Sequence, residues 1–338
     1  MPARITVTND QAEMMYVGET PWHGLGTHLD APSTAEEAIV AAHMDWTVIT
    51  QPVYTERDKA FVSIENKLAV IREDTGKVFG VFSDRYTPMQ NVDAFKFFDT
   101  VVGAGEAVYH TAGSFNGGSQ VWILARMPEK FDVANDTFEK YILLNNSHDG
   151  TKALTMILTG VRVVCWNTNQ YALGENKKRN GAEFYARHTP HVMNRANTAQ
   201  NVLGLSKVYF HNLMLGLERL ASKEFARGDL EVLVRELFHL KDDKNFEEQN
   251  KIVRYSVDEV NRLFEEGKGN SVAGVRGTAY AALNAVTEYV DYYRPVARKL
   301  VTAGVVEMIG KRFQSAWFGS GATLKQNAWD ILQRMSKN

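Results

Sequence analysis

The chain has 338 residues, of which 44% are hydrophobic and 23% charged, values typical of a globular protein with a large core. Its net charge of −2 excludes a uniformly basic polyelectrolyte, so affinity for nucleic acid would require a local basic patch. Cys165 is the single cysteine, which excludes an intrachain disulfide and a cysteine-rich zinc site.

The sequence also carries no pattern of a targeting or membrane segment. The first ten residues are polar, and no apolar run reaches the roughly 18 residues that a membrane span needs. We therefore expect a cytoplasmic protein without membrane contact.

The N-terminal half begins with an irregular segment and then a short helix over residues 34–43. Thr34 and Glu37 have the spacing of a capping box at its start. Apolar residues then recur at every second position, which predicts strands, the first around Trp46–Tyr54. Residues 68–72 and 78–82 flank Asp74-Thr75-Gly76, which is typical of a β-hairpin turn.

Further along, helical spacing over 91–102 gives way to strand patterns separated by turn residues. The predicted strands are 107–112, 120–126 and 139–145, followed by 153–159 and 160–166 as two strands or one bent strand. This order predicts an α+β fold, with an antiparallel, hairpin-rich sheet and packed helices in the N-terminal half.

After about residue 190 the strand patterns disappear. Helices are predicted over 194–227, 229–240, 246–266, 277–290 and 323–335, with Thr323 as a candidate N-cap. The charged segment 174–181 favours a boundary nearby. We therefore predict an α+β domain over 1–190 and a helical domain over 191–338.

Basic residues gather in two segments of an otherwise slightly acidic chain. Residues 151–195 hold seven basic and two acidic residues, and residues 294–338 hold eight basic and two acidic residues. Two such segments side by side would form a groove for phosphates, and interspersed aromatic rings could stack on bases. The candidate nucleic-acid contacts are Lys152, Arg162, Trp166, Lys177, Lys178, Arg179, Tyr185 and Arg187.

A second candidate site is His148-Asp149-Gly150, between two strand-like segments. A histidine beside an acid could serve as a general base or as one arm of a metal site. An Asp-Gly turn flanked by a polar histidine accounts for the same residues without any chemistry. No metal-ligand spacing involves these residues, and no cofactor or nucleotide-binding motif is complete, so we expect no cofactor or metal.

Several unusual segments resemble the phage/plasmid-like proteins, a family of unknown function found in phages, plasmids and prophage islands. They include Thr20–Gly26, Tyr86–Asn91, Thr111–Phe115, Asn146–Gly150 and Arg162–Thr168. The resemblance implies mobile DNA in a bacterial host as the setting, but no reaction. In that setting the α+β half is similar in outline to single-strand annealing proteins.

Three hypotheses follow. The first is a non-enzymatic protein that binds single-stranded DNA in recombination or replication, as a homo-oligomer and alongside host or phage replication proteins. The second is a hydrolase or nuclease centred on His148 and Asp149. The third is an anti-defence protein that binds a host protein through its helical half.

Overall fold

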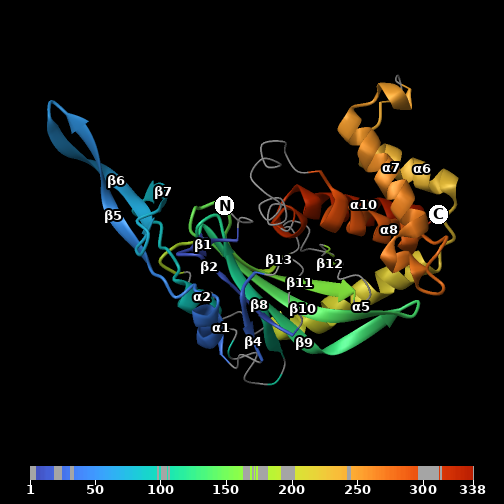
Figure 1. The fold of residues 1–338 in the computed structure, drawn as a ribbon, viewed down its shortest axis with the longest axis horizontal. Helices are drawn as coiled ribbons and strands as arrows, with labels where there is room; N and C mark the ends of the chain where they lie inside the picture. The colour runs from blue at the N-terminus through green and yellow to red at the C-terminus, as the bar shows by residue number, and fades with distance from the viewer. Residues whose placement is uncertain are drawn as a thin grey trace.

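The computed structural model describes residues 5–18, 25–30, 34–96, 99, 105, 107–162, 168–169, 171, 173, 182–191, 202–241, 245–295, 312 and 314–337. The fold is α+β, as predicted, with a largely antiparallel sheet built by the first half and helices built by the second. Figure 1 shows the helical group at one end of the sheet and a long two-stranded projection at the other.

The central sheet has the strand order β12-β11-β10-β9-β8-β3-β4 in the described part of the chain, and β13 also pairs with β11. Its pairs are antiparallel except for β3 with β4. The strands are β3 (Met14–Val17), β4 (Thr27–Leu29), β8 (Val108–Phe115), β9 (Gln120–Val133), β10 (Asp136–Ser147), β11 (Leu154–Arg162), β12 (Thr168–Asn169) and β13 (Ala182–Ala186).

The longest hairpin of this sheet, β9 with β10, turns through only two residues. Val133 pairs with Asp136, and the intervening Ala134 and Asn135 have φ of 47° and 64°. Two consecutive positive φ values are those of a type I′ turn, whose twist matches that of the flanking strands. Because the turn sequence Ala-Asn contains no glycine, the sequence did not indicate a turn here. β9 and β10 therefore extend closer to the turn than the predicted strands 120–126 and 139–145.

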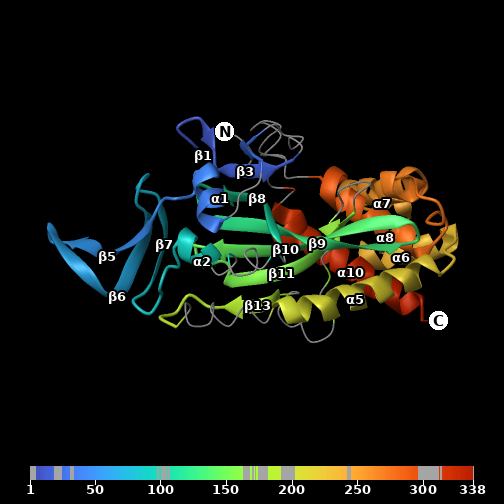
Figure 2. The ribbon, with the colours of Figure 1, turned by 90° about the horizontal axis from the view of Figure 1, so that it is seen from below.

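A separate sheet of three strands has the order β5-β6-β7. Its strands are β5 (Val48–Arg57), β6 (Ala60–Arg72) and β7 (Val78–Ser83). The hairpin predicted at 68–82 is confirmed as β6 with β7. β5 and β6 continue well beyond β7 and form a protruding β-arm, residues 48–72, which Figures 1 and 2 show extending away from the body.

Two short helices and a small hairpin complete the N-terminal half. The capping box predicted at Thr34 and Glu37 is present at the start of α1. α1 packs on β8 and β3, and α2 packs on α1 and β10. These elements are β1 (Val7–Thr8), β2 (Gln11–Ala12), α1 (Ala35–Ala41) and α2 (Asn91–Lys96).

The helical half packs against the other end of the sheet, where α5 contacts β9, β11 and β13. Its elements are α5 (Val202–Ala221), α6 (Arg227–Leu237), η3 (Phe246–Glu248), α7 (Lys251–Glu266), η4 (Lys268–Ser271), α8 (Ala279–Glu288), the π-helical turn η5 (Tyr289–Tyr293) and α10 (Ser320–Met335). The predicted cap at Thr323 is wrong. The N-cap is Gly319, and Thr323 lies in the first turn, where its N–H donates to the Gly319 carbonyl.

The buried apolar side chains of both halves form one continuous cluster. It includes Phe138 of β10, Leu213 of α5, Val286 of α8 and Leu332 of α10. None of the helices in the described ranges combines the length and the apolarity that crossing a membrane requires.

Candidate nucleic-acid interface

The loop from β10 to β11 brings the two predicted sites to one end of the central sheet. It contains His148, Asp149 and Lys152. In the pairing of β11 with β13, Leu154 lies opposite Ala186 and Thr155 opposite Tyr185. Arg187 directly follows Ala186, so Lys152, Tyr185 and Arg187 lie at the same corner as the His148-Asp149 pair.

The carboxylate of Asp149 holds this loop together. Its Oδ1 accepts hydrogen bonds from the Ser147 hydroxyl at 2.6 Å and from the Thr151 N–H at 3.0 Å. Burial acts to raise the pKa of Asp149, but these hydrogen bonds outweigh it and lower the pKa below its usual value. Asp149 is therefore an ionised anchor of its own loop.

His148 is fully buried, whereas a general base must reach its substrate. Its Nε2 lies 2.9 Å from Oδ1 of Asn91, whose Nδ2 donates to the Met44 carbonyl at 2.8 Å. The Asn91 amide thus presents an acceptor, and Nε2 of His148 carries the proton. The ring packs edge-on to Trp46 and stacks on Phe79, with centroid separations of 5.4 and 5.5 Å.

This environment leaves His148 neutral. Burial lowers its pKa to about 3, with a smaller contribution from nearby His188. A general base at neutral pH needs a pKa near 7 and access to its substrate. Burial and the low pKa therefore count against hydrolytic chemistry at the His148 ring.

His188 repeats the same arrangement on the other side of the loop. Its Nε2 lies 2.7 Å from Oδ1 of Asn146, and burial lowers its pKa to about 4. Tyr86 lies against the His188 ring at 5.3 Å and stacks on Phe82 at 4.4 Å. Phe82 and Tyr86 are half-buried, so partly exposed aromatic faces lie beside His188, which directly follows Arg187.

The predicted DNA-contacting residues differ in their exposure and contacts. Arg187 is exposed, and Tyr185 is half-buried. Lys152 is half-buried, and its Nζ donates to the Phe318 carbonyl at 2.8 Å. Four other predicted residues lie outside the described residues and are not placed: Trp166, Lys177, Lys178 and Arg179.

The prediction that Arg162 contacts phosphate is wrong. Its side chain is fully buried, and its Nε donates to Oδ2 of Asp136 at 2.5 Å. Its Nη2 donates to the Gly269 carbonyl at 2.9 Å. Because a fully buried arginine that is already paired cannot reach a solvent-side phosphate, Arg162 is structural.

The two basic segments touch each other. The bond from Lys152 to Phe318 joins them at the loop, and Tyr171 stacks on Trp329 of α10 with a centroid separation of 4.5 Å. Part of the positive charge is neutralised internally, since Lys325 is buried against Asp291 and Arg334 pairs with Glu236.

Sequence reasoning missed Asn91 and Asn146, the partners of the two buried histidines. Both lie in segments that carry the family resemblance, but nothing in their spacing indicates that they hydrogen-bond to imidazoles. In the described part of the chain, no group of three or more His, Cys, Asp and Glu side chains is arranged to hold a metal ion.

Comparisons with curated proteins and with solved structures returned no match. Residues 78–333 match a family described as a domain of unknown function, DUF932. The match begins at β7 and ends near the C-terminus of α10, so it includes the whole corner described above. The chain therefore belongs to the DUF932 family.

Proposed function

We propose that this protein binds single-stranded nucleic acid, and that it does so as a DNA-binding or annealing protein in the recombination or replication of a phage or plasmid. The observation that carries the proposal is the contact between the two basic segments, made where Lys152 donates to the Phe318 carbonyl. Proximity of cationic segments is the requirement for a phosphate-binding surface.

The aromatic side chains at the same corner support the same proposal. Phe82, Tyr86 and Tyr185 are each half-buried and lie within reach of Arg187 or the β10–β11 loop. A cationic surface interleaved with aromatic faces suits single strands, because unpaired bases stack on rings without regard to sequence. Duplex DNA offers no such unstacked faces.

Fluorescence anisotropy tests the proposal, using a labelled single-stranded oligonucleotide and a matched duplex across a salt series. We expect binding that favours the single strand and weakens steeply as salt rises, because each phosphate contact releases counterions. Equal affinity for duplex and single strand would contradict the stacking argument. An absence of binding at low salt would contradict the proposal as a whole.

A further inference from the structure

The β-arm is the most exposed part of the described chain. Every residue from Tyr54 to Lys67 is exposed, including the large apolar side chains Phe61, Val62 and Ile64. A two-stranded ribbon with no covering layer is only marginally stable in water. Apolar side chains on such a ribbon therefore indicate a partner surface.

The two faces of the arm differ in charge. Thr55 pairs with Val62 and Arg57 with Ala60, which places these four side chains on one face. Tyr54 pairs with Ser63 and Glu56 with Phe61, which places an acid among the aromatics of the other face. The face of Val62 and Arg57 thus combines apolar surface with a cation whose side chain is 82% exposed and whose Nε lies 3.8 Å from Oδ2 of the adjacent and also exposed Asp58. An ion pair this exposed contributes little free energy, so Arg57 can exchange Asp58 for another carboxylate.

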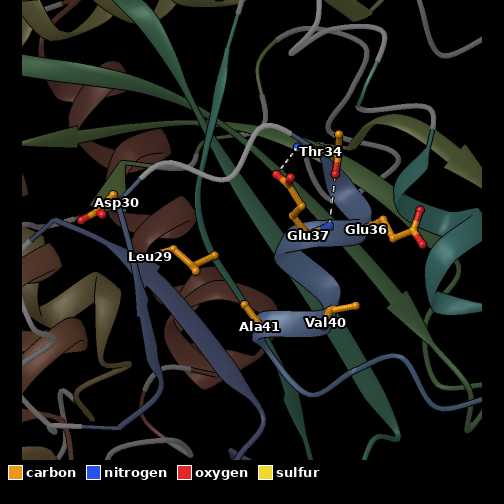
Figure 3. A pocket seen from close by; sticks show the side chains of 7 residues that line it. All are labelled: Leu29, Asp30, Thr34, Glu36, Glu37, Val40 and Ala41. Carbon is orange, nitrogen blue, oxygen red and sulfur yellow. Dashed lines mark hydrogen bonds between the residues drawn. The ribbon is translucent and has the colours of Figure 1, made fainter.

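A complementary depression lies between β4 and α1. We name it the α1 groove, a hollow of about 760 Å³ lined by Leu29, Asp30, Thr34, Glu36, Glu37, Val40 and Ala41. Figure 3 shows Leu29 directed toward the end of α1, with the carboxylates of Asp30 and Glu36 on opposite sides of the hollow. Val40 is 53% exposed. The α1 groove, an apolar surface with an acidic rim, is therefore complementary to the arm face, an apolar surface that carries the cation of Arg57.

The arm cannot fill the groove of its own chain. β5 has 10 residues, which at about 3.3 Å per residue carry its tip roughly 30 Å from its base. The base follows α1 closely in sequence, and Figures 1 and 2 show the arm extending away from α1. The matching surface must therefore come from another molecule.

We propose that the arm of one copy docks into the α1 groove of a second copy, through the face that carries Thr55, Arg57 and Val62. Nucleic acid suits the arm less well, because its basic residues Arg57, Lys59 and Lys67 are balanced by Glu56, Asp58 and Glu65. Addition of a strand along β5 is disfavoured, because Pro52 has no N–H to donate.

This interface joins two different surfaces, so a docked pair leaves the groove of one copy and the arm of the other free. Repetition of such a head-to-tail contact produces a closed ring or an open filament. The inference concerns assembly alone and is independent of the proposed DNA binding, because it is tested without nucleic acid.

The experiment is sedimentation velocity of the full chain over a range of concentrations. We expect the wild-type protein to self-associate beyond a dimer. Val62→Asp on the arm and Val40→Asp in the groove should each weaken association at least tenfold, because each buries a charge in the interface. Tyr54→Asp, on the other face of the arm, is the matched control and should associate like the wild type.

Mixing the two variants gives the sharpest result. The intact arm of Val40→Asp fits the intact groove of Val62→Asp, so the mixture should form one-to-one dimers that grow no further. Circular dichroism melts confirm that each variant is folded. A wild-type protein that stays monomeric, or a Val40→Asp variant that associates like the wild type, would overturn the proposal. Direct pairing of two arms would produce the second of these outcomes.

Discussion

Arg162 and Asp136 form an ion pair with no solvent exposure, at the place where the central sheet meets the helical half. Asp136 Oδ2 also accepts from the Tyr280 hydroxyl at 2.7 Å, and Arg162 donates to the Gly269 carbonyl. A Cβ on Gly269 would lie 2.0 Å from Arg162 Nη1. The pair therefore connects β10 and β11 to two elements of the helical half.

Removal of one member of this pair should be strongly destabilising. Asp136→Ala removes the ion-pair partner of the buried Arg162 guanidinium, which costs about 3–5 kcal/mol. Chemical denaturation measures this change in the free energy of unfolding. Asp258→Ala, at an exposed position of α7, is the control and should change it by less than about 0.5 kcal/mol. Equal effects of the two substitutions would contradict the role given to the pair.

Stability should fall as the solution is acidified from neutral pH. Burial lowers the pKa of His148 to about 3 and that of His188 to about 4, below the ordinary value near 6.5. The unfolded chain therefore binds protons at a pH where the folded protein does not. The stabilisation is complete above pH 6.5 and is lost as pH falls toward 4 to 3.

Thermal melts at pH 7.5 and pH 5 check this prediction. Each buried neutral histidine should lower the free energy of unfolding by about 2 kcal/mol between pH 7.5 and pH 5. His148→Gln should be less stable than the wild type at pH 7.5, yet lose less stability on acidification. His239→Gln is the control, because His239 is exposed and belongs to neither of the two buried histidine–asparagine pairs. An unchanged pH dependence in His148→Gln would contradict the neutral, buried state of this ring.

Binding of single strands should depend on the corner that holds Lys152 and Arg187. Replacement of both by Ala should weaken binding at least tenfold and reduce the slope of log affinity against log salt by about 1.4, since two phosphate contacts are lost. Anisotropy titrations provide both quantities. The matched control is Lys251→Ala with Arg276→Ala, which removes the same charge from exposed positions of the helical half. Similar losses in both variants would point to net charge rather than to this corner.

A substitution in the turn between β9 and β10 should increase the stability of the protein. Ala134 has φ of 47°, a left-handed conformation that costs a non-glycine residue roughly 1 kcal/mol. Asparagine accepts this conformation more readily, so Ala134→Asn should stabilise the protein by a few tenths of a kcal/mol up to about 1 kcal/mol. Ala60→Asn, on the exposed β-arm, is the control. A loss of stability in Ala134→Asn would contradict the type I′ geometry.

Local patterns in the sequence were reliable where neighbouring residues decide the conformation. The Thr34–Glu37 capping box, the β6–β7 hairpin and the helical character of the second half follow from caps, turn residues and periodicity, which act within a few residues. The Asp58-Lys59 turn of the β-arm was missed, because neither residue is a glycine although both have positive φ.

The sequence by itself determined the α+β class, the order of the main elements and the segregation of basic residues into two segments. Only the tertiary structure decided which charges are available. Arg162 and Lys152 look alike in the sequence, yet one is buried against Asp136 and the other lies at the contact between the basic segments. Burial and pairing depend on residues such as Gly269 and Phe318, which are more than a hundred positions away. No local pattern carries that information, because packing between distant elements sets both the solvation and the partner of each charge.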